Sequence, residues 1–432
     1  MQQKVKLPEL YYDSKTGAFW IKNSRGHWID LGDSGARREI KMLGMMGPSE
    51  VNPTMSLVEE TMSRITKERD VEFAGPLAGF EPGIYELCGH RVLVTRGTRP
   101  VEPAKEWKMG DFPTIETLLD QQFGEQLNHV LAWLKLAVQA MASKSFAPGH
   151  LLVLAGPPGC GKSFLQNIIT EILGGRSAKP YRYMVGNSQF NSDLFEAEHL
   201  MIEDDAASTD YRMRRQFGSV LKQFLHNQTH SYHAKGRPAM TLPCFWRLSI
   251  SVNEEPENLM VLPPLDEDLA GKILLLKVGV PDCLPDMSDS DKAKAFRANI
   301  TKELPAFLAW LKAWRIPKKM RRTKTAGRFG FDAYQHPELV EALTSMAPHH
   351  RLLGLIDSLG VVASGETWEG SADSLEKELR DKDAHNQVDR LLSFASACGT
   401  YLGRLKRERQ DRVSSRVLHG ATVWTIIGTK RH

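Results

Sequence analysis

Cysteine is scarce in this chain and follows no recognisable spacing. Five cysteines occur in 432 residues, and no two of them form a C-x-x-C pair. An odd, scattered set is not typical of a disulfide framework or of a cysteine-based zinc site, and it fits a reducing compartment. The sequence therefore favours a fold that is held together by its core rather than by cross-links.

Long apolar runs and a strong charge of one sign are also lacking. No apolar run reaches the roughly 18 residues that a membrane helix needs, and the opening MQQKVKLPEL has no apolar region like that of a signal peptide. The formal net charge of +4 is too small to indicate nucleic-acid binding unless the basic residues cluster locally. We expect a cytoplasmic protein without a membrane partner.

The clearest positive feature is residues 151–173, LLVLAGPPGCGKSFLQNIITEIL. An apolar run predicts a buried parallel strand, and spaced apolar residues after the glycines predict a helix. Between them the segment fits the P-loop pattern G-x-x-x-x-G-K-[ST], in which backbone N–H groups surround phosphates at a helix N-terminus. A chance glycine-rich turn would not have these flanks. The predicted ATP-binding residues are Gly156, Pro157, Pro158, Gly159, Cys160, Gly161, Lys162, Ser163 and Phe164.

Acidic residues follow the next apolar run, about forty residues further on, where residues 200–202 lead into Glu203, Asp204 and Asp205. Carboxylates at the C-terminal edge of a parallel sheet lie where a nucleotide binds. We assign Asp204, together with Ser163, to Mg²⁺ and Glu203 to the attacking water, with Asp205 open in either role. The alternative is that the acids cap the following helix.

Two later segments extend the pattern. Extended pieces around residues 235–238 predict a hairpin, and its basic side chains His233, Lys235 and Arg237 can follow a phosphate backbone. Solvated turn charges are the alternative. Residues 245–252 then predict a strand that ends at Asn253, whose amide can reach a γ-phosphate or the attacking water.

This ordered set, GPPGCGKS, LMIEDD, a basic hairpin and a strand ending in asparagine, resembles the core of superfamily 3 helicases within the AAA+ class. The similarity is closest to the helicase portion of phage and plasmid primase–helicase proteins, and it is strong from about residue 120 to 280. It implies a DNA helicase or translocase that uses ATP and Mg²⁺ and acts on single-stranded or forked DNA. It also implies a homo-oligomeric ring, expected to be hexameric, in replication of a phage, plasmid or mobile element in a bacterial host. A separate primase or polymerase is a further expected partner, because no primase signature precedes the core.

The resemblance also assigns roles and shows departures. Lys162, Glu203 and Asp204 would act on ATP, Lys235 would occupy the tip of the DNA-translocating hairpin, and Asn253 would be the sensor. Related helicases often have histidine after the hairpin lysine, where this chain has Gly236, and an arginine finger where it has Lys272. A lysine cannot form the bidentate fork of a guanidinium. Either Lys272 serves as the finger, or an arginine of the predicted helix over residues 211–226 reaches a neighbouring subunit; the candidates there are Arg212, Arg214 and Arg215. Slow hydrolysis is the third alternative.

The predicted fold class is α/β, with an AAA+ P-loop core, a small mixed N-terminal domain and a helical, winged-helix-like C-terminal region. Aromatic or apolar residues alternate with polar ones over residues 10–31, which predicts an antiparallel meander. Residues 371–427 predict three helices followed by two strands, as in a winged-helix module. The predicted domains are 1–110 (mixed α/β), 111–285 (ATPase core with a preceding helical collar), 286–360 (helical basic linker) and 361–432 (winged-helix-like).

Two other functions fit the same residues. One is an ATP-gated DNA-binding initiator that assembles on an origin and recruits a separate helicase without translocating. The other is an AAA+ remodeller that acts on proteins in phage defence or interference. The basic run over residues 315–328 and the hairpin tip favour DNA over a protein substrate.

Overall fold

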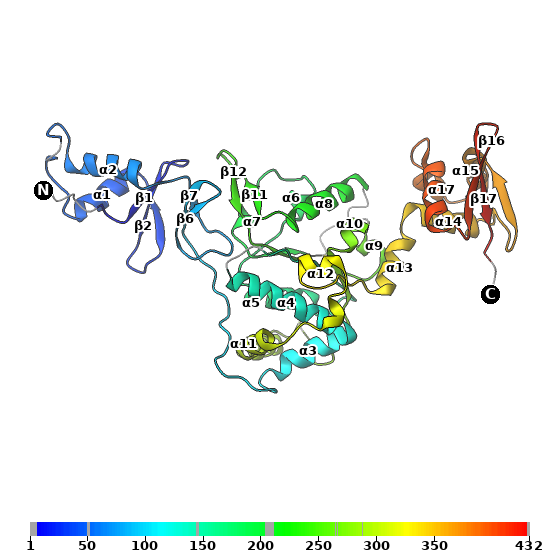
Figure 1. Ribbon diagram of the computed structural model, residues 1–432, viewed down its shortest axis with the longest axis horizontal. Coiled ribbons are helices and arrows are strands. Elements are labelled where there is room, and N and C mark those ends of the chain that lie inside the picture. Colours follow the sequence, from blue (N-terminus) through cyan, green and yellow to red (C-terminus); the bar gives the residue numbers. More distant parts are fainter. Residues whose placement is uncertain are drawn as a thin grey trace. The chain divides into compact units, whose positions relative to one another are not determined.

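The structure is a computed structural model that describes residues 7–49, 52–143, 147–203, 211–263, 265, 267–286 and 288–429. The chain forms two compact units (Figure 1). The first comprises Met1–Glu254 and Val261–His336, and the second comprises Glu255–Met260 and Pro337–His432.

The first unit begins with two small sheets. The antiparallel meander predicted for residues 10–31 is confirmed, and a fourth strand joins it in parallel, in the order β3-β2-β1-β4. Two helices pack on this sheet, the second of which starts with a capping box between Ser56 and Glu59. The elements are β1 (Leu10–Asp13), β2 (Ala18–Lys22), β3 (Trp28–Leu31), α1 (Asp33–Met42), α2 (Leu57–Glu68) and β4 (Asp70–Val71), followed by a sheet of β5 (Phe73–Gly75), β6 (Gly83–Leu87) and β7 (His90–Val94).

A five-stranded sheet, parallel throughout, forms the centre of the first unit. Its order is β14-β8-β13-β10-β9, from β8 (Leu151–Ala155), β9 (Ser177–Ala178), β10 (His199–Ile202), β13 (Arg247–Val252) and β14 (Ile273–Lys277). The chain leaving β8 runs toward β9 at one edge, whereas the chain leaving the adjacent β13 runs toward β14 at the other. Such a reversal marks the place where open α/β sheets bind ligands, beyond the carboxyl ends of the strands.

Four helices and one face of this sheet share the main hydrophobic core (Figure 1). Alternate strand residues such as Leu152 and Leu154 pack against them, as the pleat requires. The helices are α3 (Pro113–Phe123), α4 (Leu127–Ala142), α5 (Lys162–Ile172) and α11 (Ser290–Ala313). Gly124, with φ of +47°, ends α3, and the 3-10 turn η1 (Gly124–Gln126) separates it from α4.

The remaining elements of the first unit include an antiparallel hairpin of β11 (Thr229–Tyr232) and β12 (Met240–Pro243). The helical segments are α6 (Tyr181–Met184), α7 (Ser192–Phe195), α8 (Tyr211–Phe224), α10 (Glu267–Ala270), η2 (Lys318–Met320) and α12 (Lys324–Phe329).

The second unit packs helices around a three-stranded sheet of order β15-β17-β16. Leu352, Ile356, Leu402, Leu405 and Ile426 belong to its core. Its elements are α9 (Pro256–Leu259), α13 (Pro337–Ser345), α14 (Pro348–Ser358), β15 (Thr367–Gly370), α15 (Ala372–Lys382), α16 (Gln387–Leu391), α17 (Ala397–Glu408), β16 (Val413–Leu418) and β17 (Ala421–Ile427). None of the helices in the described ranges combines the length and apolar character needed to cross a membrane.

Candidate nucleotide-binding site

The glycine-rich loop lies between the carboxyl end of β8 and the first turn of α5. Gly159 and Gly161 have φ of +80° and +88°, a conformation that favours glycine. At Gly156 the limit is space, because a Cβ there would lie 2.4 Å from the carbonyl oxygen of Val278. The loop is therefore a backbone cradle at a helix N-terminus, which suits phosphate.

Lys162 and Asn253 meet at the reversal point of the sheet. Lys162 is the first residue of α5 and Asn253 directly follows β13. The Lys162 Nζ donates to Asn253 Oδ1 at 3.0 Å and to the carbonyl oxygens of Gly156 and Pro157 at 2.7 and 2.9 Å. Two residues 91 positions apart thus converge at the loop.

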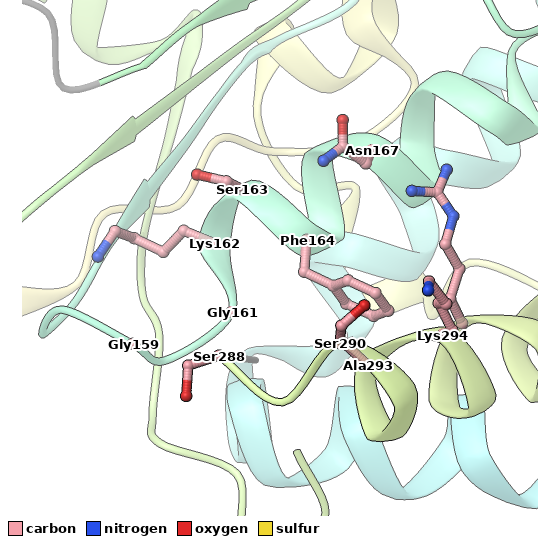
Figure 2. A pocket seen from close by; sticks show the side chains of 11 residues that line it. Gly159, Gly161, Lys162, Ser163, Phe164, Asn167, Ser288, Ser290, Ala293 and Lys294 are labelled. Carbon is pink, nitrogen blue, oxygen red and sulfur yellow. The ribbon is translucent and has the colours of Figure 1, made fainter. Parts of the chain in front are cut away.

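A pocket of about 630 Å³ opens beside the loop (Figure 2). One wall is the outer face of α5, with Ser163, Phe164 and Asn167, and the other is the start of α11, with Ser290 and Lys294. The whole lining is Gly159, Gly161, Lys162, Ser163, Phe164, Asn167, Ser288, Ser290, Ala293, Lys294 and Arg297. In Figure 2 the Lys162 side chain extends away from the α11 wall, so the loop and the wall can contact different parts of one ligand.

Asn167 and the α11 residues were not found by sequence reasoning. Ala293, Lys294 and Arg297 follow the i, i+1, i+4 spacing of an ordinary helix face, and no local motif marks them. The α11 start is fixed by Asp289, whose carboxylate accepts hydrogen bonds from the backbone N–H groups of Asp291 and Lys292.

Cys160 is a structural member of the loop. Its side chain is buried, and burial raises the pKa of its thiol, which keeps the thiol protonated and unreactive at neutral pH. Its carbonyl oxygen accepts a hydrogen bond of 2.8 Å from the Gln122 amide of α3. The helix α3 therefore supports the loop from behind.

The acidic residues are only partly described. Glu203 follows β10 and forms an ion pair with Lys179, 2.6 Å between Nζ and Oε2. Asp204 and Asp205 lie outside the described residues. A further acid, Glu254, follows Asn253 at the same sheet edge and lies 3.6 Å from the Lys277 ammonium. Glu254 was not among the predicted site residues.

A buried polar network connects three elements beneath the site. The hydroxyl of Ser249 on β13 accepts from the Gln166 amide of α5 at 2.8 Å and lies 2.8 Å from His199 Nε2 on β10. His199 Nδ1 lies 2.8 Å from the Thr170 hydroxyl, also on α5. Burial lowers the pKa of His199 to about 3, so the ring is neutral. The network fixes the P-loop helix against the strands that carry Asn253 and Glu203.

The three predicted DNA-binding residues have different surroundings. Lys235 is exposed in the turn between β11 and β12, next to Gly236, with φ of +76°. Arg237 faces the N-terminal meander, and its Nη1 lies 3.8 Å from the buried carboxylate of Asp13. The His233 ring packs on Phe190 at a centroid distance of 5.2 Å.

The finger candidates do not gather at the loop in the part of the chain that the structure describes. Lys272 precedes β14 and donates to the Asp268 carbonyl oxygen, at the amino end of the sheet and thus opposite the glycine loop. The Arg214 guanidinium donates to the Leu262 carbonyl oxygen at 2.9 and 3.1 Å. The side chains of Arg212 and Arg215 are outside the description.

Solved structures of the C-terminal region of NrS-1 align with nearly the whole chain. One apo form matches with a TM-score of 0.54 at 13% identity and covers 97% of this chain and 96% of that one. A second apo structure of the same region gives 0.53 and 12% over the same shares. The two chains share a fold. At this identity the likeness concerns the fold alone.

Other comparisons reach less of the chain. A family model described as "Family of unknown function (DUF5906)" matches residues 154–268, which include the glycine loop, β10 and β13. A structure of JCV helicase aligns with 55% of the chain at 13% identity, but its TM-score of 0.31 is too low to support an argument. No curated protein matches the chain.

Proposed function

We propose that this chain is a Mg²⁺-dependent ATPase that translocates on or unwinds single-stranded or forked DNA, in the manner of superfamily 3 helicases. The observation that carries the proposal is the convergence of Lys162 and Asn253 at a glycine cradle on the carboxyl edge of a parallel sheet. This is the arrangement that the sequence resemblance implies for binding and sensing a triphosphate. Its biological setting would be replication of a phage, plasmid or mobile element.

Lys162 would change partners when nucleotide binds. Its ammonium is now bonded to neutral oxygens of Gly156, Pro157 and Asn253. Phosphate oxygens carry charge and accept stronger hydrogen bonds, so Lys162 would turn to the β- and γ-phosphates. The Asn253 amide would then be free to orient the γ-phosphate or a water molecule.

Metal and charge would come from neighbouring residues. Ser163 and Asp204 would hold Mg²⁺, and Glu203 would orient water, with Lys179 fixing its carboxylate. Lys294 and Arg297 add positive charge from α11 in the same chain. Lys272 lies at the amino edge of the sheet, so as a finger it would act on the site of an adjacent copy. The ring of copies, hexameric, is what the resemblance implies.

The first experiment replaces the lysine of the loop. We expect Lys162→Ala to abolish ATP hydrolysis while the fold is kept, because the ammonium that would bind the phosphates is lost. Lys377→Ala removes an exposed lysine of α15 and serves as the matched control. Phosphate release and circular dichroism provide the measurements. Equal hydrolysis by wild type and Lys162→Ala would remove the enzymatic proposal.

A nucleotide-gated DNA-binding initiator is the second candidate, favoured by a lysine where an arginine finger is expected. The two functions differ in strand displacement. An ATP-dependent release of the labelled strand from a forked duplex supports the helicase, whereas ATP-dependent DNA binding without release supports the initiator.

A further inference from the structure

Two adjacent histidines and a glutamate converge in the second unit. His349 and His350 lie in the first turn of α14, and Glu408 is the last residue of α17. The Glu408 Oε2 is 2.8 Å from His349 Nε2 and 3.1 Å from His350 Nε2, and one ligand atom from each residue lies within 4.8 Å of the others. Ligand atoms bound tetrahedrally at about 2.0–2.2 Å from one ion are roughly 3.4 Å apart. Two of the three spacings are therefore already short enough.

The two helices that carry these residues are held rigidly by the core. Leu352 and Leu353 of α14 and Leu402 and Leu405 of α17 all belong to the buried cluster of this unit. The His349 residue is itself buried, with 8% of its surface exposed. A site built on packed helices keeps its geometry better than a site on loops.

The surroundings of the cluster shift the pKa values of two of its members, His349 and Glu408. Burial lowers the pKa of His349, and this effect exceeds the opposing one of Glu408. Burial alone would raise the pKa of Glu408, but the hydrogen bonds from the two imidazoles lower it overall. Neutral imidazole and carboxylate are the ligating forms.

We propose that His349, His350 and Glu408 bind one divalent transition-metal ion, Zn²⁺ foremost, with water completing the coordination. Two imidazoles and one carboxylate form a known catalytic-type zinc ligand set, whereas Mg²⁺ and Ca²⁺ prefer oxygen ligands alone. The ion would tie the start of α14 to the end of α17. This site is independent of the proposed ATPase.

The affinity should be modest. The His349 Nδ1 is buried without a hydrogen-bond partner in the described part of the chain. An outer-shell acceptor at that position usually strengthens metal binding by about 10- to 100-fold. The positive charge of nearby Arg404 would also weaken the binding of a metal cation, because like charges repel. We therefore expect Zn²⁺ to bind about 10- to 100-fold more weakly than at a site that has such an acceptor.

The test titrates ZnCl₂ into the full-length, chelator-treated protein, with MgCl₂ in parallel, by isothermal titration calorimetry and thermal melting. We expect one saturable equivalent of Zn²⁺, a raised melting temperature and no comparable Mg²⁺ binding by the proposed site. His350→Ala and Glu408→Gln should weaken that equivalent at least about tenfold. His385→Ala, an exposed histidine of the same unit, should leave it unchanged.

Glu408→Gln keeps a carbonyl oxygen that accepts from both imidazoles, so a folded variant is available even if the histidine substitution disturbs packing. Absence of saturable Zn²⁺ binding by wild type would overturn the proposal. So would binding that survives both substitutions unchanged, because the ion would then lie elsewhere.

Discussion

At the scale of single residues, Gly156 is the most constrained position of the cradle. A methyl group there would lie 2.4 Å from the Val278 carbonyl oxygen, and that oxygen belongs to backbone that cannot rotate away. We expect Gly156→Ala to shift the loop, to lower nucleotide affinity at least tenfold and to destabilise the unit by about 1–3 kcal/mol. Fluorescent nucleotide binding and denaturant titration are the measurements.

Gly354→Ala is the matched control for this substitution. Gly354 lies inside α14, where an added Cβ meets no atom within 4 Å. The change should stabilise that helix by roughly 0.5–1 kcal/mol and leave nucleotide binding unaltered. Unchanged nucleotide affinity in Gly156→Ala would contradict the role assigned to the cradle.

Single residues were predictable where a short motif carries them. Lys162, Ser163 and Asn253 could be chosen because each follows a buried strand in a recognisable local pattern, and the structure does bring Lys162 and Asn253 together. Lys294 and Arg297 could not be predicted as site residues, because they reach the pocket only through the packing of α11 against α3 and α4. Long-range packing leaves no local trace in the sequence. The assigned roles in ATP binding stay predictions.

At the scale of elements, the hairpin of β11 and β12 separates its basic residues into two groups. Arg237 is engaged by Asp13, while Lys235 is exposed at the turn. If the turn contacts DNA, Lys235 would couple ATP hydrolysis to movement of the DNA and would not take part in hydrolysis itself. We therefore expect Lys235→Ala to keep basal ATP hydrolysis but to lose DNA stimulation and most strand displacement, measured on a forked duplex.

The control is Arg25→Ala, which removes an exposed cation from another hairpin turn, between β2 and β3. It should behave like wild type in both assays. Full strand displacement by Lys235→Ala would refute the role of the hairpin tip.

Elements were predictable to the degree that their pattern is periodic. The strand and the helix predicted within residues 151–173, on either side of the glycines, are present as β8 and α5. The three helices and two strands predicted within residues 371–427 are also present. The strand β15 was missed, because its four residues are half-buried or exposed and give no apolar run. Domain boundaries stay predictions.

At the scale of the whole molecule, two buried neutral histidines make the first unit sensitive to acid. Burial lowers the pKa values of both His150 and His199 to about 3, below the ordinary value of 6.5. The unfolded chain therefore binds more protons than the folded chain between pH 6.5 and 3. Stability should fall as the pH falls through that window, by about 1.4 kcal/mol per pH unit for each group once the pH is well below 6.5.

Denaturant unfolding from pH 8 to pH 5 checks this expectation. Between pH 8 and 7 the two histidines should hardly change the free energy of unfolding, and this free energy should begin to decline near pH 6.5. The range above pH 5 is informative because most carboxylates are still ionised there. A free energy of unfolding that stays flat from pH 7 to 5 would show that the two rings are not neutral and buried as described.

The contact between Asp13 and Arg237 has a mechanical consequence. Asp13 is fully buried, and its Oδ1 also accepts from the backbone N–H groups of Lys15 and Thr16, so the meander is anchored at the same carboxylate that faces the hairpin. Tyr232 of β11 packs edge-on against Phe73 of β5 at 5.2 Å, which adds a second attachment. If the hairpin moves, the N-terminal sheets would therefore have to move with it. Separating the two would leave the buried Asp13 carboxylate without the Arg237 guanidinium beside it, which is unfavourable.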